Sequence, residues 1–143
     1  MKAISELNNL SINLHIIFIF LTIFVIARLI LLFFKESEYQ KFSKIYERWI
    51  LFFRALLGAI IFSGVVVMAT MHFHVRWQVW LMSLFTLYLL LATINEALIY
   101  NSINLKSPSQ KSNFCKKMKQ RYILYLILLI IVMIVSEKNA IFV

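Results

Sequence analysis

The sequence predicts an all-α membrane protein, a bundle of four transmembrane helices. Of its 143 residues 62% are hydrophobic, its mean hydropathy is +0.85, and it holds only two glycines and one proline. A soluble domain of this size has roughly half apolar residues. A helix needs about 20 apolar residues to cross a bilayer, and four such runs fill most of the chain. We therefore expect a single membrane domain over residues 1–143.

The first span is expected over residues 11–34, where the charged stretch that follows Phe34 ends it. The residues before it do not resemble a cleavable signal, because the apolar run is too long and no small-residue cleavage site follows. The next residues, 36–48, are polar, with apolar side chains three and four apart at Tyr39, Phe42, Ile45 and Tyr46. This spacing indicates a short amphipathic helix on the membrane surface, with a plain connecting loop as the alternative.

The second span is expected over residues 49–70, with Trp49 as an interfacial anchor. Small residues recur four apart at Ala55, Ala59 and Ser63, beside two glycines. Small residues let helix backbones approach closely. This face therefore packs inside the bundle or against a partner.

The third span is expected over residues 77–100 and the fourth over residues 121–136. The polar break over residues 71–77 makes the second and third spans an antiparallel pair. Between the third and fourth spans, residues 101–120 are polar and basic around Pro108, which predicts a loop that is mobile at its middle.

The basic residues of the connections predict the orientation. Four lysines and arginines lie between Lys35 and Arg48, and six lie between Lys106 and Arg121, whereas residues 71–76 contain one. Loops rich in lysine and arginine stay cytoplasmic. We expect an integral protein of a bacterial inner membrane with both termini periplasmic. The basic excess then faces anionic lipid, so nucleic acid is not expected as a partner.

All three histidines are expected at one level near the outer surface. His15 lies about one turn inside the first span, and His72 and His74 lie in the outer turn. Imidazole is the commonest transition-metal ligand and the usual axial ligand of haem in membrane bundles. The three histidines are therefore candidate ligands of a metal or of haem b. The alternative is that they are simply hydrated residues at a bilayer surface.

A second polar level is expected near the cytoplasmic surface. Arg28, Arg54 and Glu96 fall within about one turn of one another in depth when the spans pack antiparallel. Ionisable residues in a span are costly and are functional candidates by default. Glu96 is expected to accept from one guanidinium, which leaves a positive site for a carboxylate, a phosphate or a lipid head group. The alternative is that both arginines extend separately to the interface.

The chain resembles the HemJ-type protoporphyrinogen oxidases and the related CopD-like membrane domains. The resembling stretches are Leu14 to Ile17 at the start of the first span, Arg28-Leu29 near its end, Lys44 to Arg48 before the second span, and the aliphatic fourth span. The resemblance implies a haem-associated His15 and a functional Arg28. The stretch between these residues is plain aliphatic and aromatic, unlike the family pattern, which makes a relative without the oxidase reaction equally consistent.

No nucleophile-base pair, phosphate-binding glycine loop, paired carboxylates or zinc-protease motif occurs in the sequence. Lone Cys115 excludes an intramolecular disulfide. Two functions are therefore expected. The first is a haem- or porphyrin-linked membrane redox protein in which His15 is an axial ligand and the arginines meet carboxylates. The second is a non-enzymatic accessory or assembly subunit that packs against itself or against a larger membrane complex.

Overall fold

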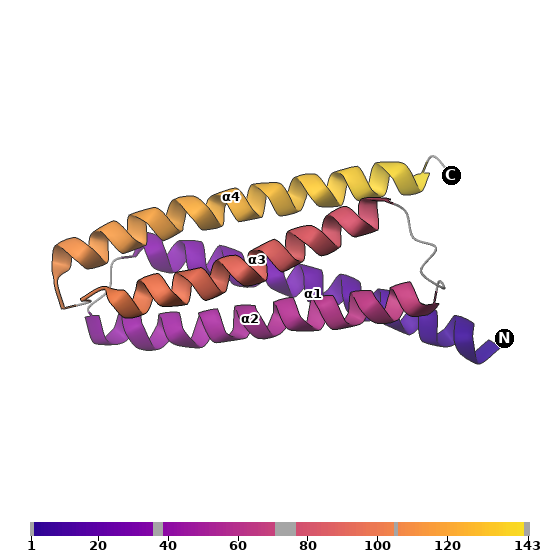
Figure 1. Ribbon diagram of the computed structural model, residues 1–143, viewed down its shortest axis with the longest axis horizontal. Coiled ribbons are helices and arrows are strands. Elements are labelled where there is room, and N and C mark those ends of the chain that lie inside the picture. The colour runs from indigo at the N-terminus through magenta and orange to yellow at the C-terminus, as the bar shows by residue number, and fades with distance from the viewer. Residues whose placement is uncertain (1, 36–38, 71–76, 105, 142–143) are drawn as a thin grey trace.

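The protein is a bundle of four α-helices in a computed structural model, which describes residues 2–35, 39–70, 77–104 and 106–141. The helices are α1 (Lys2–Phe34), α2 (Tyr39–Thr70), α3 (Trp77–Ser102) and α4 (Pro108–Ile141) (Figure 1). Each is long and apolar enough to cross a membrane, and the described part of the chain contains no strand. The predicted fold class is confirmed, and the chain is an integral membrane protein.

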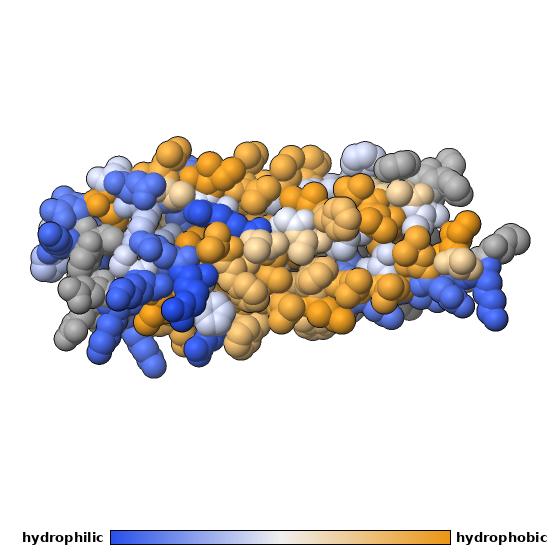
Figure 2. All heavy atoms as spheres, turned by 90° about the horizontal axis from the view of Figure 1, so that it is seen from below, coloured by the Kyte–Doolittle hydropathy of each residue, from blue (hydrophilic) through white to orange (hydrophobic). Residues whose placement is uncertain are grey.

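Consecutive helices run antiparallel, so the two ends of the chain lie at the same end of the bundle (Figure 1). Helix α1 packs against α2 and α4, and α3 packs against α2 and, less extensively, against α4. The opposite end holds the α1–α2 and α3–α4 connections, and we call it the basic end (residues 34–48 and 102–121). Hydrophilic residues gather there, and an apolar band follows it along the bundle (Figure 2).

Two helices extend further toward the basic end than the sequence predicts. The stretch expected as a surface helix or loop belongs to α2, which runs without a break from Tyr39 to Thr70. Two of its apolar side chains, Phe42 and Tyr46, are buried in the bundle, whereas Ile45 is exposed. The expected loop over residues 101–120 is also mostly helical, since α4 starts at Pro108. Proline fits the first turn of a helix, where no backbone donor is needed.

Aromatic rings from all four helices fill the interior of the basic end. Phe33 of α1 lies 6.0 Å from the ring of Tyr46 in α2 and 5.5 Å from that of Tyr122 in α4. Tyr100 of α3 lies 4.7 Å from Tyr46 and 5.6 Å from Phe114. Each aromatic pair contributes about 0.5–1.5 kcal/mol beyond its buried area. This cluster therefore holds the four helices together where α2 and α4 leave the apolar band.

Candidate functional site

The most unusual group in the described chain is the carboxylate of Glu96, which is only 2% exposed. The Tyr46 hydroxyl donates to its Oε1 across 2.5 Å, and the Tyr122 hydroxyl donates to its Oε2 across 2.8 Å. The three residues come from α2, α3 and α4. Buried carboxylates are stable only when their oxygens are hydrogen-bonded. Two tyrosine donors meet that requirement here without an ion pair.

The helical register explains why these side chains meet. On α2, the buried residues Phe42, Tyr46, Ile50 and Phe53 recur at three and four positions, which places them on one face. On α4, the buried residues Met118, Tyr122 and Tyr125 do the same, and on α3 so do Leu89, Thr93 and Glu96. Tyr46, Tyr122 and Glu96 thus each lie on the interior face of a helix, where their side chains can meet.

Arg54 lies near this carboxylate but is not paired with it. Its Nη2 donates to the backbone oxygen of Thr93 across 3.0 Å, and its Nε is buried without a hydrogen-bond partner in the described chain. Arg54 is eight residues beyond Tyr46 on α2, about 12 Å further along the axis, so it reaches the turn of α3 before Glu96. Arg54 and Arg121 still act on Glu96 electrostatically.

Arg28 has a separate environment. Its guanidinium lies over the ring of Trp49, 5.5 Å from the centroid. Among the described residues, neither Arg28 nor Arg54 forms an ion pair with Glu96. The structure therefore does not join the three predicted charges directly. Glu96 is satisfied by tyrosines, which leaves both arginines without a carboxylate at ion-pair distance.

A hollow of about 270 Å³ opens between α2 and α3 beside this site. We call it the α2–α3 cleft. Arg54 lines it together with residues of both helices: Tyr46, Glu47, Ile50, Leu51, Ala97, Tyr100 and Asn101. The Tyr100 hydroxyl at its rim accepts or donates a 2.9 Å hydrogen bond with Ser43 and lies 3.2 Å from Glu47 Oε1. The cleft thus has the positively charged Arg54 at its inner end and, at its rim, the Glu47 carboxylate, which accepts from Tyr100.

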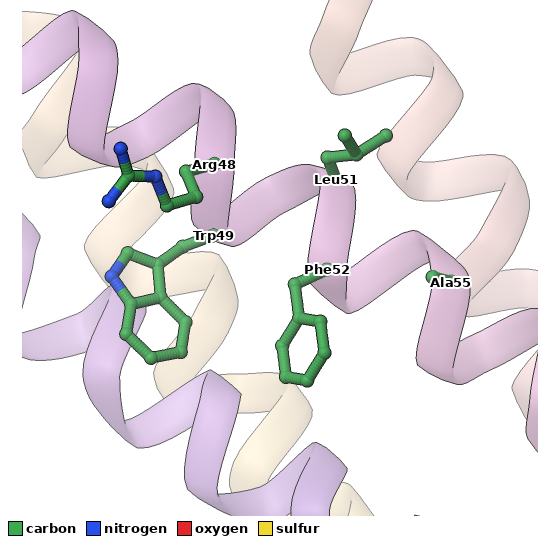
Figure 3. A pocket seen from close by; sticks show the side chains of 5 residues that line it. All are labelled: Arg48, Trp49, Leu51, Phe52 and Ala55. Carbon is green, nitrogen blue, oxygen red and sulfur yellow. The ribbon is translucent and has the colours of Figure 1, made fainter.

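A second, larger hollow of about 510 Å³ lies on the outer surface of α2 (Figure 3). Arg48, Trp49, Leu51, Phe52 and Ala55 line it. The Trp49 and Phe52 rings extend to the same side of the helix, and Arg48 lies at one end of the row (Figure 3). Leu51 borders both hollows, so this apolar surface, with Arg48 at one end, adjoins the α2–α3 cleft.

His15 lies between α1 and α2, half-buried, well along the bundle from Glu96. Its Nδ1 is 2.8 Å from the Ser63 hydroxyl, which itself donates to the Ile60 backbone oxygen across 3.1 Å. When the serine proton is donated to the Ile60 oxygen, the imidazole donates from Nδ1. The lone pair is then on Nε2.

The other predicted ligands are not brought to His15 by the described structure. His72 and His74 lie outside the described residues. Within residues 2–35, 39–70, 77–104 and 106–141, no group of three or more histidine, cysteine, aspartate or glutamate side chains is placed to hold a metal ion. The described chain therefore supplies one imidazole to a metal or haem, and no closed metal site.

The small residues of α2 do not form one packing face. Ser63 is buried against α1, whereas Ala55 is exposed and lines the outer hollow. Gly58 is also exposed, and a Cβ added there would meet nothing within 4 Å. Gly64, in contrast, faces α1, because a Cβ added there would lie 3.4 Å from Cε1 of His15.

Tyr46 and Tyr122 are the site residues that the sequence reasoning missed. The sequence places Tyr46 in the polar stretch before the second span and Tyr122 at the start of the fourth span, without a role for either. A signal was present: each falls on an apolar 3-4 spacing that continues into the following span, such as Phe114, Met118, Tyr122 and Tyr125 on α4. Tyrosines on such a face are expected to find a polar partner inside the bundle.

Comparisons with protein-family models, with curated proteins and with solved structures gave no match to this chain. The function is therefore argued from the site alone.

Proposed function

We propose that the protein is a non-enzymatic membrane accessory protein that binds an anionic amphiphile at its basic end. The acidic group would enter the α2–α3 cleft, and the apolar part would lie along the Trp49 and Phe52 surface of α2. The observation that supports this proposal is the state of Arg54. Its charge has no carboxylate partner at ion-pair distance among the described residues, its Nε lacks an acceptor, and it lines a hollow.

The chemistry of the ligand follows from this donor set. A guanidinium presents several N–H groups in a fixed fork that fits carboxylate and phosphate oxygens. The Asn101 amide at the rim adds a group that can donate to the same oxygens. Because Glu96 is already satisfied by two tyrosines, it does not compete for the guanidinium. The site therefore favours an acidic group over a neutral one.

Binding is tested by thermal unfolding of the purified protein in neutral detergent. Phosphatidylglycerol, phosphatidylcholine and inorganic phosphate are added separately, so that a lipid and a free anion are distinguished. A ligand at 100 times its Kd stabilises the folded state by about 2.7 kcal/mol. We expect phosphatidylglycerol to raise the melting temperature of the parent, and Arg54→Gln to lose most of that rise.

Lys117→Gln is the matched control, because it removes the same charge from an exposed position on α4. It should keep the lipid-dependent rise. An equal rise for the parent and Arg54→Gln would contradict the proposal, as would an equal rise with phosphatidylcholine.

A second candidate is the haem- or porphyrin-linked redox function, the class that the resemblance to HemJ-type proteins implies. The His15 ring supports it: Nδ1 is hydrogen-bonded to Ser63, as the second nitrogen of a ligating histidine usually is, which leaves Nε2 to bind the iron. His15 fits an axial ligand in this respect. A bound haem would supply electron transfer.

This candidate predicts a coloured protein. A Soret band should be present after expression with added haem, and it should disappear in His15→Ala. A colourless parent, or an unchanged band in His15→Ala, would contradict the redox function and leave the accessory function as the remaining candidate.

A further inference from the structure

The rim of the α2–α3 cleft carries a carboxylate whose position is fixed by hydrogen bonds. Glu47 Oε1 accepts from the Ser43 hydroxyl across 3.0 Å and from the Tyr100 hydroxyl across 3.2 Å. Ser43 lies one turn earlier on α2, and Tyr100 belongs to α3, so Glu47 is hydrogen-bonded to both helices that form the cleft. The neighbouring Arg48 lines the outer hollow instead. The Glu47 carboxylate is therefore a fixed part of the cleft.

Glu47 and Arg54 are opposite charges that line one cleft without pairing. They are seven residues apart on α2, which places them on one side of the helix, about 10 Å apart along its axis. Arg54 Nη2 donates to the Thr93 backbone oxygen, and both hydrogen bonds of Glu47 go to Oε1. Within the described chain, Arg54 Nε has no acceptor, and Glu47 Oε2 receives no hydrogen bond. A ligand in the cleft therefore meets a guanidinium at the inner end and a carboxylate oxygen at the rim.

The carboxylate restricts what can follow the acidic group of a ligand. When Arg54 holds a phosphate at the inner end, the part of the head group beyond the phosphate lies at the rim, on the side of the aqueous basic end. A hydroxyl at that place can donate to Glu47 Oε2, and a hydrogen bond to a charged acceptor is stronger than one between neutral groups. A second negative charge at that place is repelled by Glu47.

We propose that Glu47 selects the ligand of the cleft, which is a phosphodiester with a single negative charge and a hydroxyl in its head group, the chemistry of phosphatidylglycerol. This proposal rests on the binding function argued above and names the ligand class. A phosphate monoester such as phosphatidic acid carries more than one negative charge at pH 7. Arg54 alone favours that larger charge, whereas Glu47 opposes it. Unfavourable contacts determine specificity as much as favourable ones do.

Three lipids with identical acyl chains separate these two effects. Phosphatidylglycerol and phosphatidylmethanol are both singly charged phosphodiesters and differ in the head-group hydroxyls, whereas phosphatidic acid is the monoester. Each is titrated into the purified protein in neutral detergent, and the rise in melting temperature gives its apparent affinity. We expect phosphatidylglycerol to bind the parent roughly two- to tenfold more tightly than phosphatidylmethanol, the range of one hydrogen bond. Phosphatidic acid should bind no more tightly than phosphatidylmethanol.

Glu47→Gln keeps the size of the side chain and removes its charge. In this variant the advantage of phosphatidylglycerol over phosphatidylmethanol should shrink. Phosphatidic acid should become the tightest ligand of the three, because Arg54 then acts without an opposing charge in the cleft. Glu6→Gln is the matched control, since it removes the same charge from an exposed position on α1, at the other end of the bundle. It should keep the parental order of affinities.

The failure of this proposal and the failure of the binding function give different results. A parent whose melting temperature responds to none of the three lipids would contradict the binding function itself. A parent that binds phosphatidylglycerol and phosphatidylmethanol equally, or phosphatidic acid most tightly, would keep the binding function and overturn selection by Glu47. An unchanged order of affinities in Glu47→Gln would also overturn it, because another group would then rank the lipids.

Discussion

The Tyr122 hydroxyl donates to Glu96 Oε2 across 2.8 Å and so joins α4 to α3, two helices that otherwise touch little. Tyr46 does the same for α2 at the other oxygen. A single carboxylate therefore connects three helices at one depth.

Tyr122→Phe should lower the free energy of unfolding by about 1–3 kcal/mol, because it leaves a buried carboxylate oxygen without its donor. Urea or thermal unfolding in detergent measures the loss. Tyr125→Phe is the control, since Tyr125 is also buried but makes no hydrogen bond in the described chain. Equal effects of the two changes would mean that packing, and not the hydrogen bond, stabilises this position.

Glu96→Gln should be less stable than the parent, because the amide nitrogen that replaces one oxygen cannot accept from a tyrosine. In the double variant with Tyr122→Phe, the loss of unfolding free energy should be smaller than the sum of the losses in the two single variants, because both changes remove the same interaction. A double-mutant cycle on unfolding free energies measures this coupling. Additive losses would show that Glu96 and Tyr122 act independently.

Ser63→Ala should cost about 0.5–1.5 kcal/mol, because the His15 ring loses its hydrogen bond to the Ser63 hydroxyl. Thermal unfolding of the variant checks this. Ser102→Ala is the comparison, because it removes the same kind of hydroxyl bond to a backbone oxygen three residues earlier, at an exposed position of α3. If Ser63→Ala and the comparison lose the same unfolding free energy, the hydrogen bond between His15 and Ser63 does not stabilise the fold.

Gly58→Ala should raise the free energy of unfolding by up to about 1 kcal/mol. The residue is inside α2, glycine is a poor helix former, and the added methyl group meets nothing within 4 Å. Gly64→Leu should instead destabilise the protein, because its side chain would enter the space of the His15 ring. Melting temperatures that move together in the two variants would contradict this placement of the glycines.

A reporter that is active only in the cytoplasm should give a signal when inserted beside Lys106, and no signal when fused after Val143. The physical reason is the excess of lysine and arginine in the two connections of the basic end. A cytoplasmic signal from the fusion at Val143 would reverse the orientation, although both ends of the chain would still share one side.

The sequence by itself determined the four spans and the antiparallel order of the helices. Both depend on one property, the cost of placing charged or polar backbone and side chains in hydrocarbon, which is summed along the chain and needs no knowledge of neighbours. The same reasoning located Glu96 as a polar residue inside a span. It also placed Arg54 near the same level.

Only the tertiary structure decided which side chains meet. In a membrane bundle both the lipid-facing and the interior residues are apolar, so the hydropathy of a span does not give its rotation about its own axis. The expected partner of Glu96 was an arginine, but the rotation of α2 and α4 presents Tyr46 and Tyr122 to it instead. That rotation also leaves Arg54 facing the α2–α3 cleft, and the proposed binding function rests on it.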